Sequence, residues 1–185
     1  SFNQNLYNWD VQNVETMESM FECAISFNGN IGKWDVQNVQ DMESMFQFAN
    51  SFNNDISRWN VENVQYMNLM FESAKKFNKD ISNWNVGNVI DMTGMFGNAE
   101  NFNQDISSWN VSNVTDMSGM FFGSAFNQDI SDWDVSNGTY FKQMFYEADS
   151  FNQDLRNWTL NENAYFEEIF KGADLMQSNQ GLGDT

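Results

Sequence analysis

Apolar positions recur along this chain in a fixed order, and their period changes once within each unit of about 25 residues. Trp34 and Val36 alternate around a polar residue, which is the two-residue period of a short strand. The next apolar positions stand at i, i+3, i+4 and i+7, which is one stripe of a helix; they are Met42, Met45, Phe46 and Ala49. Each unit therefore predicts one short strand followed by one short helix.

The predicted helices have an acidic residue at their start in several units. Asp41, Asp91 and Asp116 directly precede the apolar stripes. A carboxylate in that place can accept bonds from free helix N–H groups and favours the positive end of the helix dipole. We therefore expect these aspartates to cap the helices.

The unit repeats about seven times. All seven tryptophans fall in phase, at steps of 25 residues with one step of 24, and they are Trp9, Trp34, Trp59, Trp84, Trp109, Trp133 and Trp158. A single strand-and-helix unit of this size cannot bury its apolar edge, but stacked copies cover one another. The tryptophans are thus expected to form a buried structural core.

The predicted fold class is a repeat solenoid of about seven turns, with parallel short β-strands on one face and short helices on the other. Residues 1–175 are expected to form a single solenoid domain whose N-terminal end is uncapped. Residues 176–185 are expected to be a polar C-terminal tail or cap, as terminal repeats require.

Composition narrows the function classes. The formal net charge is −18, from 26 acidic against 8 basic residues, and this repels nucleic acid and anionic lipid surfaces. The chain has no histidine and one cysteine, so no nucleophile and base recur together and no intramolecular disulfide can form. No apolar run approaches the length of a membrane span. We expect no enzyme activity, no cofactor and no direct membrane insertion.

The repeated motif resembles a known family. The units read Ile-x-x-Trp-x-Val-x-x-Val-x-x-Met-x-x-Met-Phe-x-x-Ala followed by Phe-Asn, as in FNQDISSWNVSNVTDMSGMF at residues 102–121. This pattern is similar to the BspA-like leucine-rich-repeat proteins, in the branch found in bacterial surface proteins and mycoplasma-type lipoproteins. The resemblance implies a leucine-rich-repeat solenoid, secreted or displayed at the cell surface, that serves adhesion or protein binding without catalysis. The chain departs from many leucine-rich repeats in having valine, for example Val39, where they place asparagine.

Polar residues beside the inward Trp and Val positions should point outward and form one continuous surface, which is commonly the binding surface of such folds. We therefore predict a site for a protein or glycan of a host or neighbouring cell on the strand face. Its candidate residues are Asp10, Asp35, Asn60, Asn85, Asn110, Asp134, Lys33, Arg58 and Ser108. The alternative interpretation of these positions is plain solvation.

A second acidic column raises the question of calcium. Five successive units carry aspartate at one position, and these residues are Asp55, Asp80, Asp105, Asp129 and Asp154. Calcium suits several oxygen ligands without histidine. The alternative is that each carboxylate accepts backbone N–H bonds in its own loop, as aspartate does in turns. The columns that include Asn28 and Asn38 are likewise expected to serve turns within their own loops.

Two function classes follow. The first is a surface-displayed or secreted interaction module, located outside the cell or at its surface. The second is a structural building block of a filament or surface layer, formed when the open N-terminal end stacks on another copy, since uncovered parallel edges invite such pairing.

Overall fold

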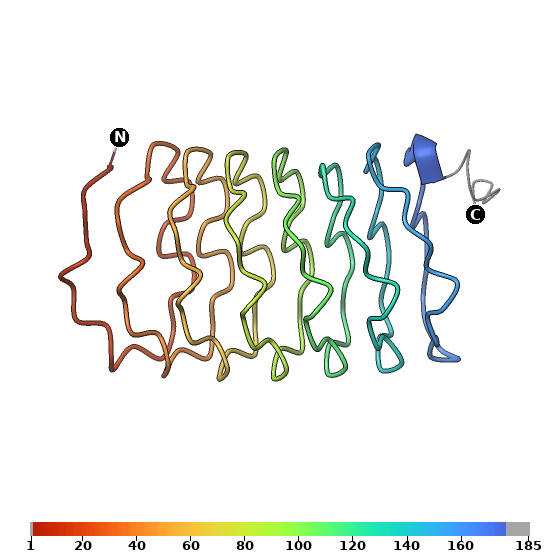
Figure 1. Ribbon diagram of the computed structural model, residues 1–185, viewed down its shortest axis with the longest axis horizontal. Coiled ribbons are helices and arrows are strands. Elements are labelled where there is room, and N and C mark those ends of the chain that lie inside the picture. The colour runs from red at the N-terminus through yellow and green to blue at the C-terminus, as the bar shows by residue number, and fades with distance from the viewer. Residues whose placement is uncertain (1, 177–185) are drawn as a thin grey trace.

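The computed structural model describes residues 2–176, which wind into a row of stacked turns (Figure 1). The turns follow one another along the longest axis, so the first and the last described turns lie at opposite ends of the row. Each turn is one sequence repeat, because equivalent residues lie on top of one another. The rings of Trp34 and Trp59 stack at 6.4 Å, and so do those of Trp59 and Trp84.

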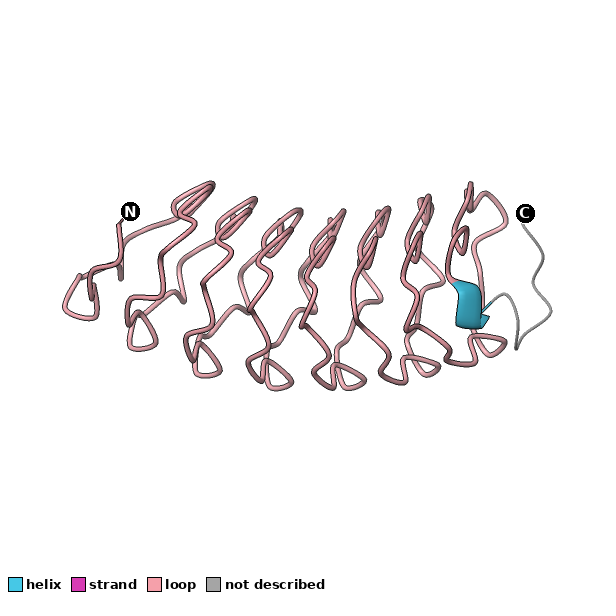
Figure 2. Ribbon diagram, turned by 90° about the horizontal axis from the view of Figure 1, so that it is seen from above, coloured by secondary structure: helices cyan, strands magenta, loops and turns pink. Residues whose placement is uncertain are grey.

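Regular secondary structure is nearly absent from the described residues (Figure 2). The only helical residues among 2–176 are 174–176. Strand pairing within the same range is limited to isolated parallel bridges between successive turns: Thr16–Asp41, Asp41–Tyr66, Tyr66–Asp91, Asp91–Asp116, Asp116–Tyr140 and Tyr140–Tyr165. The predicted fold class, a leucine-rich-repeat-like solenoid of strands and helices, is therefore wrong.

Residues 42–49, predicted as a helix, form a series of overlapping β-turns. The amide of Met45 donates to the Met42 carbonyl at 3.2 Å, and the amide of Ala49 donates to the Phe46 carbonyl at 2.9 Å. The alternate amides donate to the next turn of the stack instead. Met42 donates to the Tyr66 carbonyl at 3.0 Å, and Phe46 donates to the next turn in the same way. Together the two kinds of bond satisfy the hydrogen-bonding groups of the backbone, so a helix would add no further hydrogen bonds to this segment.

Left-handed residues in the same segment exclude a right-handed helix. Ser44 and Phe48 have φ angles of 54° and 57°, and equivalent residues in other turns do the same. The helical spacing still identified the buried side, because β-turns that repeat every few residues also bring positions i, i+3, i+4 and i+7 to one side. All four members of the stripe are fully buried, namely Met42, Met45, Phe46 and Ala49.

The acidic residues expected to cap helices begin the β-turn segments. Oδ1 of Asp41 accepts the Glu43 amide at 2.9 Å, and Asp91 and Asp116 each accept the amide two residues further on at 2.8 Å. The predicted hydrogen bond to a nearby backbone N–H is present, but the expected helix is not.

The predicted strand around Trp34 and Val36 is also wrong. Both side chains are buried, as the alternation indicates. The nearby amides of Trp34 and Val39 donate to carbonyls of their own turn, at 3.1 and 2.9 Å. Side chains make the links between turns here, since the Trp34 indole N–H donates to the Leu6 carbonyl at 2.9 Å.

Asparagines link successive turns, contrary to the expectation that they serve only their own loops. The amide of Asn53 donates to Oδ1 of Asn28 at 2.8 Å, and the amide of Asn78 donates to Oδ1 of Asn53 at 3.1 Å. In the second column, Nδ2 of Asn38 donates to the carbonyl of Gln12 in the preceding turn at 2.6 Å. An asparagine ladder is therefore present, at positions other than the one that many leucine-rich repeats use.

The core consists of apolar columns that run the length of the stack. Phe46 and Phe52 of one turn stack at 3.9 Å, and each also stacks on its equivalent in the next turn, at 5.6 and 5.8 Å. Because every interior turn has the same neighbours, the same set of side chains buries the apolar side of each turn.

One turn changes two core residues together. Gly138 occupies the place that Val114 has in the turn before, and Phe141 replaces Met117. A Cβ at Gly138 would lie 2.3 Å from Cζ of Phe141. The larger ring thus fills the space that the missing valine side chain leaves, and packing stays dense.

Candidate functional site

The predicted outward column lies on the surface as expected and is ordered by short-range bonds. Oδ1 of Asp35 accepts the amide of Gln37 at 3.2 Å, and Oδ1 of Asn60 accepts the amide of Glu62 at 3.2 Å. Asp10, Asn85, Asn110 and Asp134 make the same bond to the amide two residues on. The bond fixes the direction of each side chain while leaving it exposed.

The three neighbouring candidates have different surroundings. Lys33 and Arg58 line a shallow hollow of about 190 Å³ that Asp55 also borders. Ser108 donates its hydroxyl to the carbonyl of Ser82 in the preceding turn at 3.0 Å. We call the surface made by all nine predicted residues the outer polar face: Asp10, Asp35, Asn60, Asn85, Asn110, Asp134, Lys33, Arg58 and Ser108.

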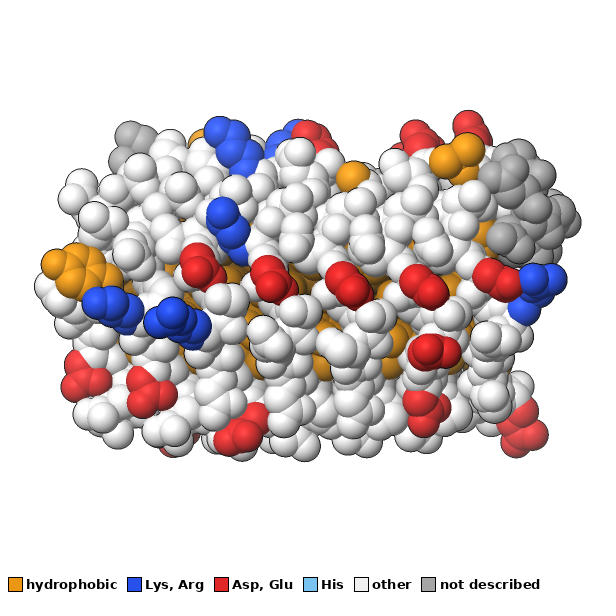
Figure 3. Space-filling view, viewed as in Figure 1, with side chains coloured by type: hydrophobic (Ala, Val, Ile, Leu, Met, Phe, Trp, Pro, Cys, Tyr) orange, Lys and Arg blue, Asp and Glu red, His pale blue; other side chains and the backbone are white. Residues whose placement is uncertain are grey.

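The second acidic column has the geometry of turns. A row of acidic side chains crosses the face seen in Figure 3, and five aspartates recur at one position in successive turns. Each accepts the amide two residues on, at 2.9 to 3.0 Å, and these residues are Asp55, Asp80, Asp105, Asp129 and Asp154.

These bonds lower the pKa of each carboxyl group. For Asp55 and Asp105 the largest cause is the hydroxyl of the serine two residues on, followed by the serine amide. The pKa of Asp154 falls to about 2 because the Arg156 side chain and amide both donate to it. Within residues 2–176, no three acidic or cysteine side chains gather where they could hold a metal ion. The hydrogen-bond donors to these five carboxylates are groups of the chain itself, two residues further on.

The tryptophans lie in one column, with a difference at the first. Trp34, Trp59, Trp84, Trp109 and Trp133 are 3 to 4% exposed, and each indole N–H donates to a carbonyl of the preceding turn at 2.9 to 3.2 Å. Trp158 makes the same bond at 3.0 Å and is partly buried. Trp9, in the first described turn, is 54% exposed and stacks on Trp34 at 6.3 Å.

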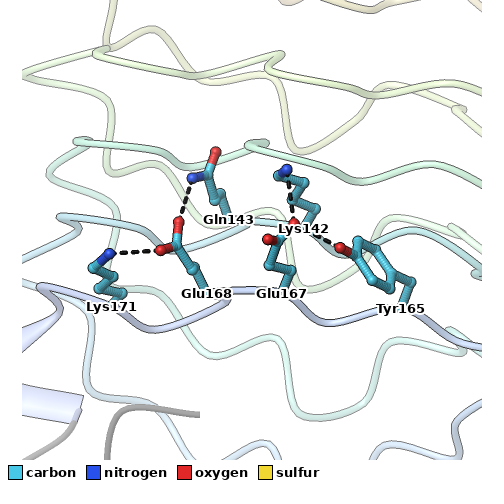
Figure 4. Close-up of polar contacts among 6 residues, drawn as sticks. All are labelled: Lys142, Gln143, Tyr165, Glu167, Glu168 and Lys171. Atoms are coloured by element: carbon cyan, nitrogen blue, oxygen red, sulfur yellow. Dashed lines mark hydrogen bonds and ion pairs between the residues drawn. The ribbon is translucent and has the colours of Figure 1, made fainter.

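A polar cluster near the C-terminal end was not predicted from the sequence (Figure 4). Glu167 accepts bonds from the Lys142 ammonium at 2.7 Å and from the Tyr165 hydroxyl at 2.6 Å, and both lower its pKa. Glu168 accepts a bond from Gln143 at 2.7 Å. Opposite charges at equivalent positions of successive repeats, such as Lys142 and Glu167, were the signal that could have identified this cluster.

No helix among the described residues is long and apolar enough to span a membrane. The predicted C-terminal tail, residues 176–185, lies outside the described residues except for Met176, which is buried.

Comparison with curated proteins and with solved structures gives no match. The sequence does match the family described as "Mycoplasma protein of unknown function, DUF285", over residues 1–101 and again over residues 79–182. Two matches that together span nearly the whole chain agree with the repeats seen in sequence and structure. The match supports a repeat protein without specifying the BspA-like leucine-rich-repeat branch. The chain belongs to the DUF285 family of Mycoplasma repeat proteins.

Proposed function

We propose that this chain is a non-enzymatic interaction module, secreted or displayed at a cell surface, that binds a protein or glycan through the outer polar face. The observation that supports it most is the ordered exposure of one polar column. Equivalent side chains stand at each turn, held by bonds such as that from the Gln37 amide to Asp35. Groups that are already ordered lose little conformational freedom when a partner binds.

The rigid scaffold supports the same proposal. The apolar columns are buried and the turns are bonded to one another, so the spacing of the outer residues is set by the stack. A partner with its own regular spacing could contact several turns at once, which raises the total affinity without any single strong contact. The resemblance to BspA-like surface repeats agrees with this location and is part of the proposal.

The test replaces the outer column by lysine. We compare a variant carrying Asp35→Lys, Asn60→Lys, Asn85→Lys and Asn110→Lys with the unaltered chain on arrays of host extracellular-matrix proteins and glycans. A specific signal that the variant loses supports the proposal. An equal signal from both proteins refutes the use of this face.

A matched control separates site loss from a change in net charge. The control carries lysine at four positions of another exposed column, Glu15, Gln40, Gln65 and Ile90, and changes the net charge by the same amount. We expect it to retain binding. Thermal unfolding of both variants establishes that they are folded when the arrays are read.

End-to-end association is the second candidate, as a building block of a filament or surface layer. The stacking contacts between turns recur along the row, since Phe27 stacks on Phe52 at 6.1 Å and Trp34 stacks on Trp59 at 6.4 Å. Rings of this kind could stack on a further turn from another copy. Light scattering across a wide concentration range tests it, and a strictly monomeric chain at high concentration would exclude it.

A further inference from the structure

One outward column of the β-turn segments is interrupted by a glycine. Its members in chain order are Glu22, Gln47, Glu72, Gly97, Phe122, Tyr146 and Lys171. Side chains on both sides of the interruption contact their neighbours in the column. Gln47 donates a hydrogen bond to Glu72, and the rings of Phe122 and Tyr146 stack at 5.1 Å with an interplanar angle of 4°.

The interruption opens a hollow of about 340 Å³. Glu72 borders it on one side and Phe122 on the other, with the buried backbone of Gly94 and Gly97 beneath. Successive turns are separated here by 5.7 and 5.9 Å, measured between the rings of the inward phenylalanines that precede these residues. The gap that the missing side chain leaves is therefore about as wide as the spacing between two turns, which gives room for a single flat group.

Two further residues that border the hollow are engaged elsewhere. The Lys142 ammonium pairs with Glu167 at 2.7 Å, and Gln143 donates to Glu168 at 2.7 Å (Figure 4). The positive charge of Lys142 is thus balanced within the protein.

The walls of the hollow combine an aromatic face with a carboxylate. Tyr146 covers one face of the Phe122 ring, so the opposite face borders the hollow above Gly97. Oε2 of Glu72 is bonded to Gln47, and within residues 2–176 no donor contacts its Oε1. The other ring of the aromatic pair already has a cation beside it, since Nζ of Lys171 lies 5.7 Å from the centre of the Tyr146 ring.

We propose that this hollow binds an arginine side chain of a partner protein, with the guanidinium stacked on Phe122 and hydrogen-bonded to Glu72. A guanidinium is flat, packs on aromatic faces and donates two parallel bonds to a carboxylate, whereas a lysine ammonium is a strongly hydrated point charge. The net charge of −18 attracts basic partners. This site lies on the β-turn segments and shares no residue with the outer polar face, so it stands independently of the function proposed above.

The probe is Nα-acetyl-arginine N-methylamide, titrated into the ¹⁵N-labelled chain and followed by NMR. We expect shifts confined to amides around the hollow, including those of Gly94, Gly97 and Gly119, with a dissociation constant in the millimolar range. The citrulline analogue has the same shape without the charge and should bind roughly tenfold more weakly. Methyl β-glucoside is titrated in parallel.

Three variants test whether the arginine derivative binds in the hollow. Gly97→Gln places a side chain in the hollow, as Gln47 does in its turn; its Cβ would lie 3.3 Å from the Gly94 carbonyl oxygen and 3.4 Å from Cγ of Glu72, so a small adjustment admits it. It should abolish binding. Glu72→Gln should weaken binding roughly tenfold, and the matched control Glu22→Gln, far from the hollow, should leave it unchanged.

Several outcomes would overturn the proposal. One is the absence of shifts up to roughly 50 mM arginine derivative, where a millimolar site would be saturated. Others are equal affinities of Glu72→Gln and Glu22→Gln, or undiminished binding by folded Gly97→Gln. Shifts at these amides with the glucoside but not the arginine derivative would assign the hollow to a glycan instead.

Discussion

Replacing an interior tryptophan by phenylalanine tests whether the tryptophan column holds the turns together. Trp84 is 3% exposed, and its indole N–H donates to the Ile56 carbonyl of the preceding turn at 3.2 Å. Trp9 is the matched control, since it occupies the equivalent position but is 54% exposed.

The expected loss of unfolding free energy for Trp84→Phe has two parts. Phenylalanine lacks roughly two buried ring carbons, which costs about 1.5 kcal/mol at about 0.8 kcal/mol per buried carbon group. The Ile56 carbonyl also accepts the Trp59 amide at 3.1 Å, so it retains a partner. Losing the indole bond therefore costs about 1 kcal/mol rather than the larger penalty of an orphaned buried group. We expect Trp84→Phe to lower the free energy of unfolding by about 2.5 kcal/mol.

Equilibrium unfolding in guanidinium chloride, followed by the fluorescence of the remaining tryptophans, measures this loss. The denaturation midpoint should fall with an unchanged slope, and Trp9→Phe should cost less than about 0.5 kcal/mol. If the two variants lose the same stability, the indole bonds and burial do not hold the turns together and the reasoning fails.

Three further predictions concern the links between turns, the core and the acidic column. Asn78→Ala removes the acceptor for an amide of the next turn, at 3.0 Å, and should lower the free energy of unfolding by about 1 kcal/mol, measured by thermal unfolding. The control is Asn85→Ala, because the Asn85 side chain bonds within its own turn, and it should lose less than half as much stability. Equal losses would contradict the asparagine ladder. Gly138→Val should cost about 1–3 kcal/mol by overpacking, and adding Phe141→Met should recover more than half of that loss in denaturant unfolding; no recovery would disprove the proposed compensation. The pKa of Asp154 is about 2 in the folded chain against 3.8 ordinarily, so its stabilising effect is present above about pH 4 and is lost as pH falls through 2. Asp154→Asn should therefore flatten the loss of melting temperature between pH 4 and 2, and an identical acid profile would contradict this.

The candidate site was predictable to the extent that it depends on register. Because each repeat has the same length, Asp35, Asn60 and Asn85 had to lie in one column, and they are exposed as expected. The hollow at Gly97 was not predicted. A glycine in one repeat leaves a hollow only because the side chains of Glu72 and Phe122, which are far apart in the chain, border it from the two adjacent turns.

The sequence by itself determined the repeat, its phase and the buried side chains. The periodic placement of Trp, Phe and Met leaves one side of each unit apolar, and only stacking can bury it. Trp34 and Met42 are accordingly buried.

Only the tertiary structure decided the backbone. The stripe Met42, Met45, Phe46 and Ala49 satisfies a helix and a series of β-turns equally well, because both bring these positions to one side. The neighbouring turns make the difference: their carbonyls accept alternate amides, as Tyr66 does from Met42 at 3.0 Å. A backbone that must bond across the stack as well as within its turn cannot direct all its amides along a helix axis, and no single repeat read alone contains that constraint.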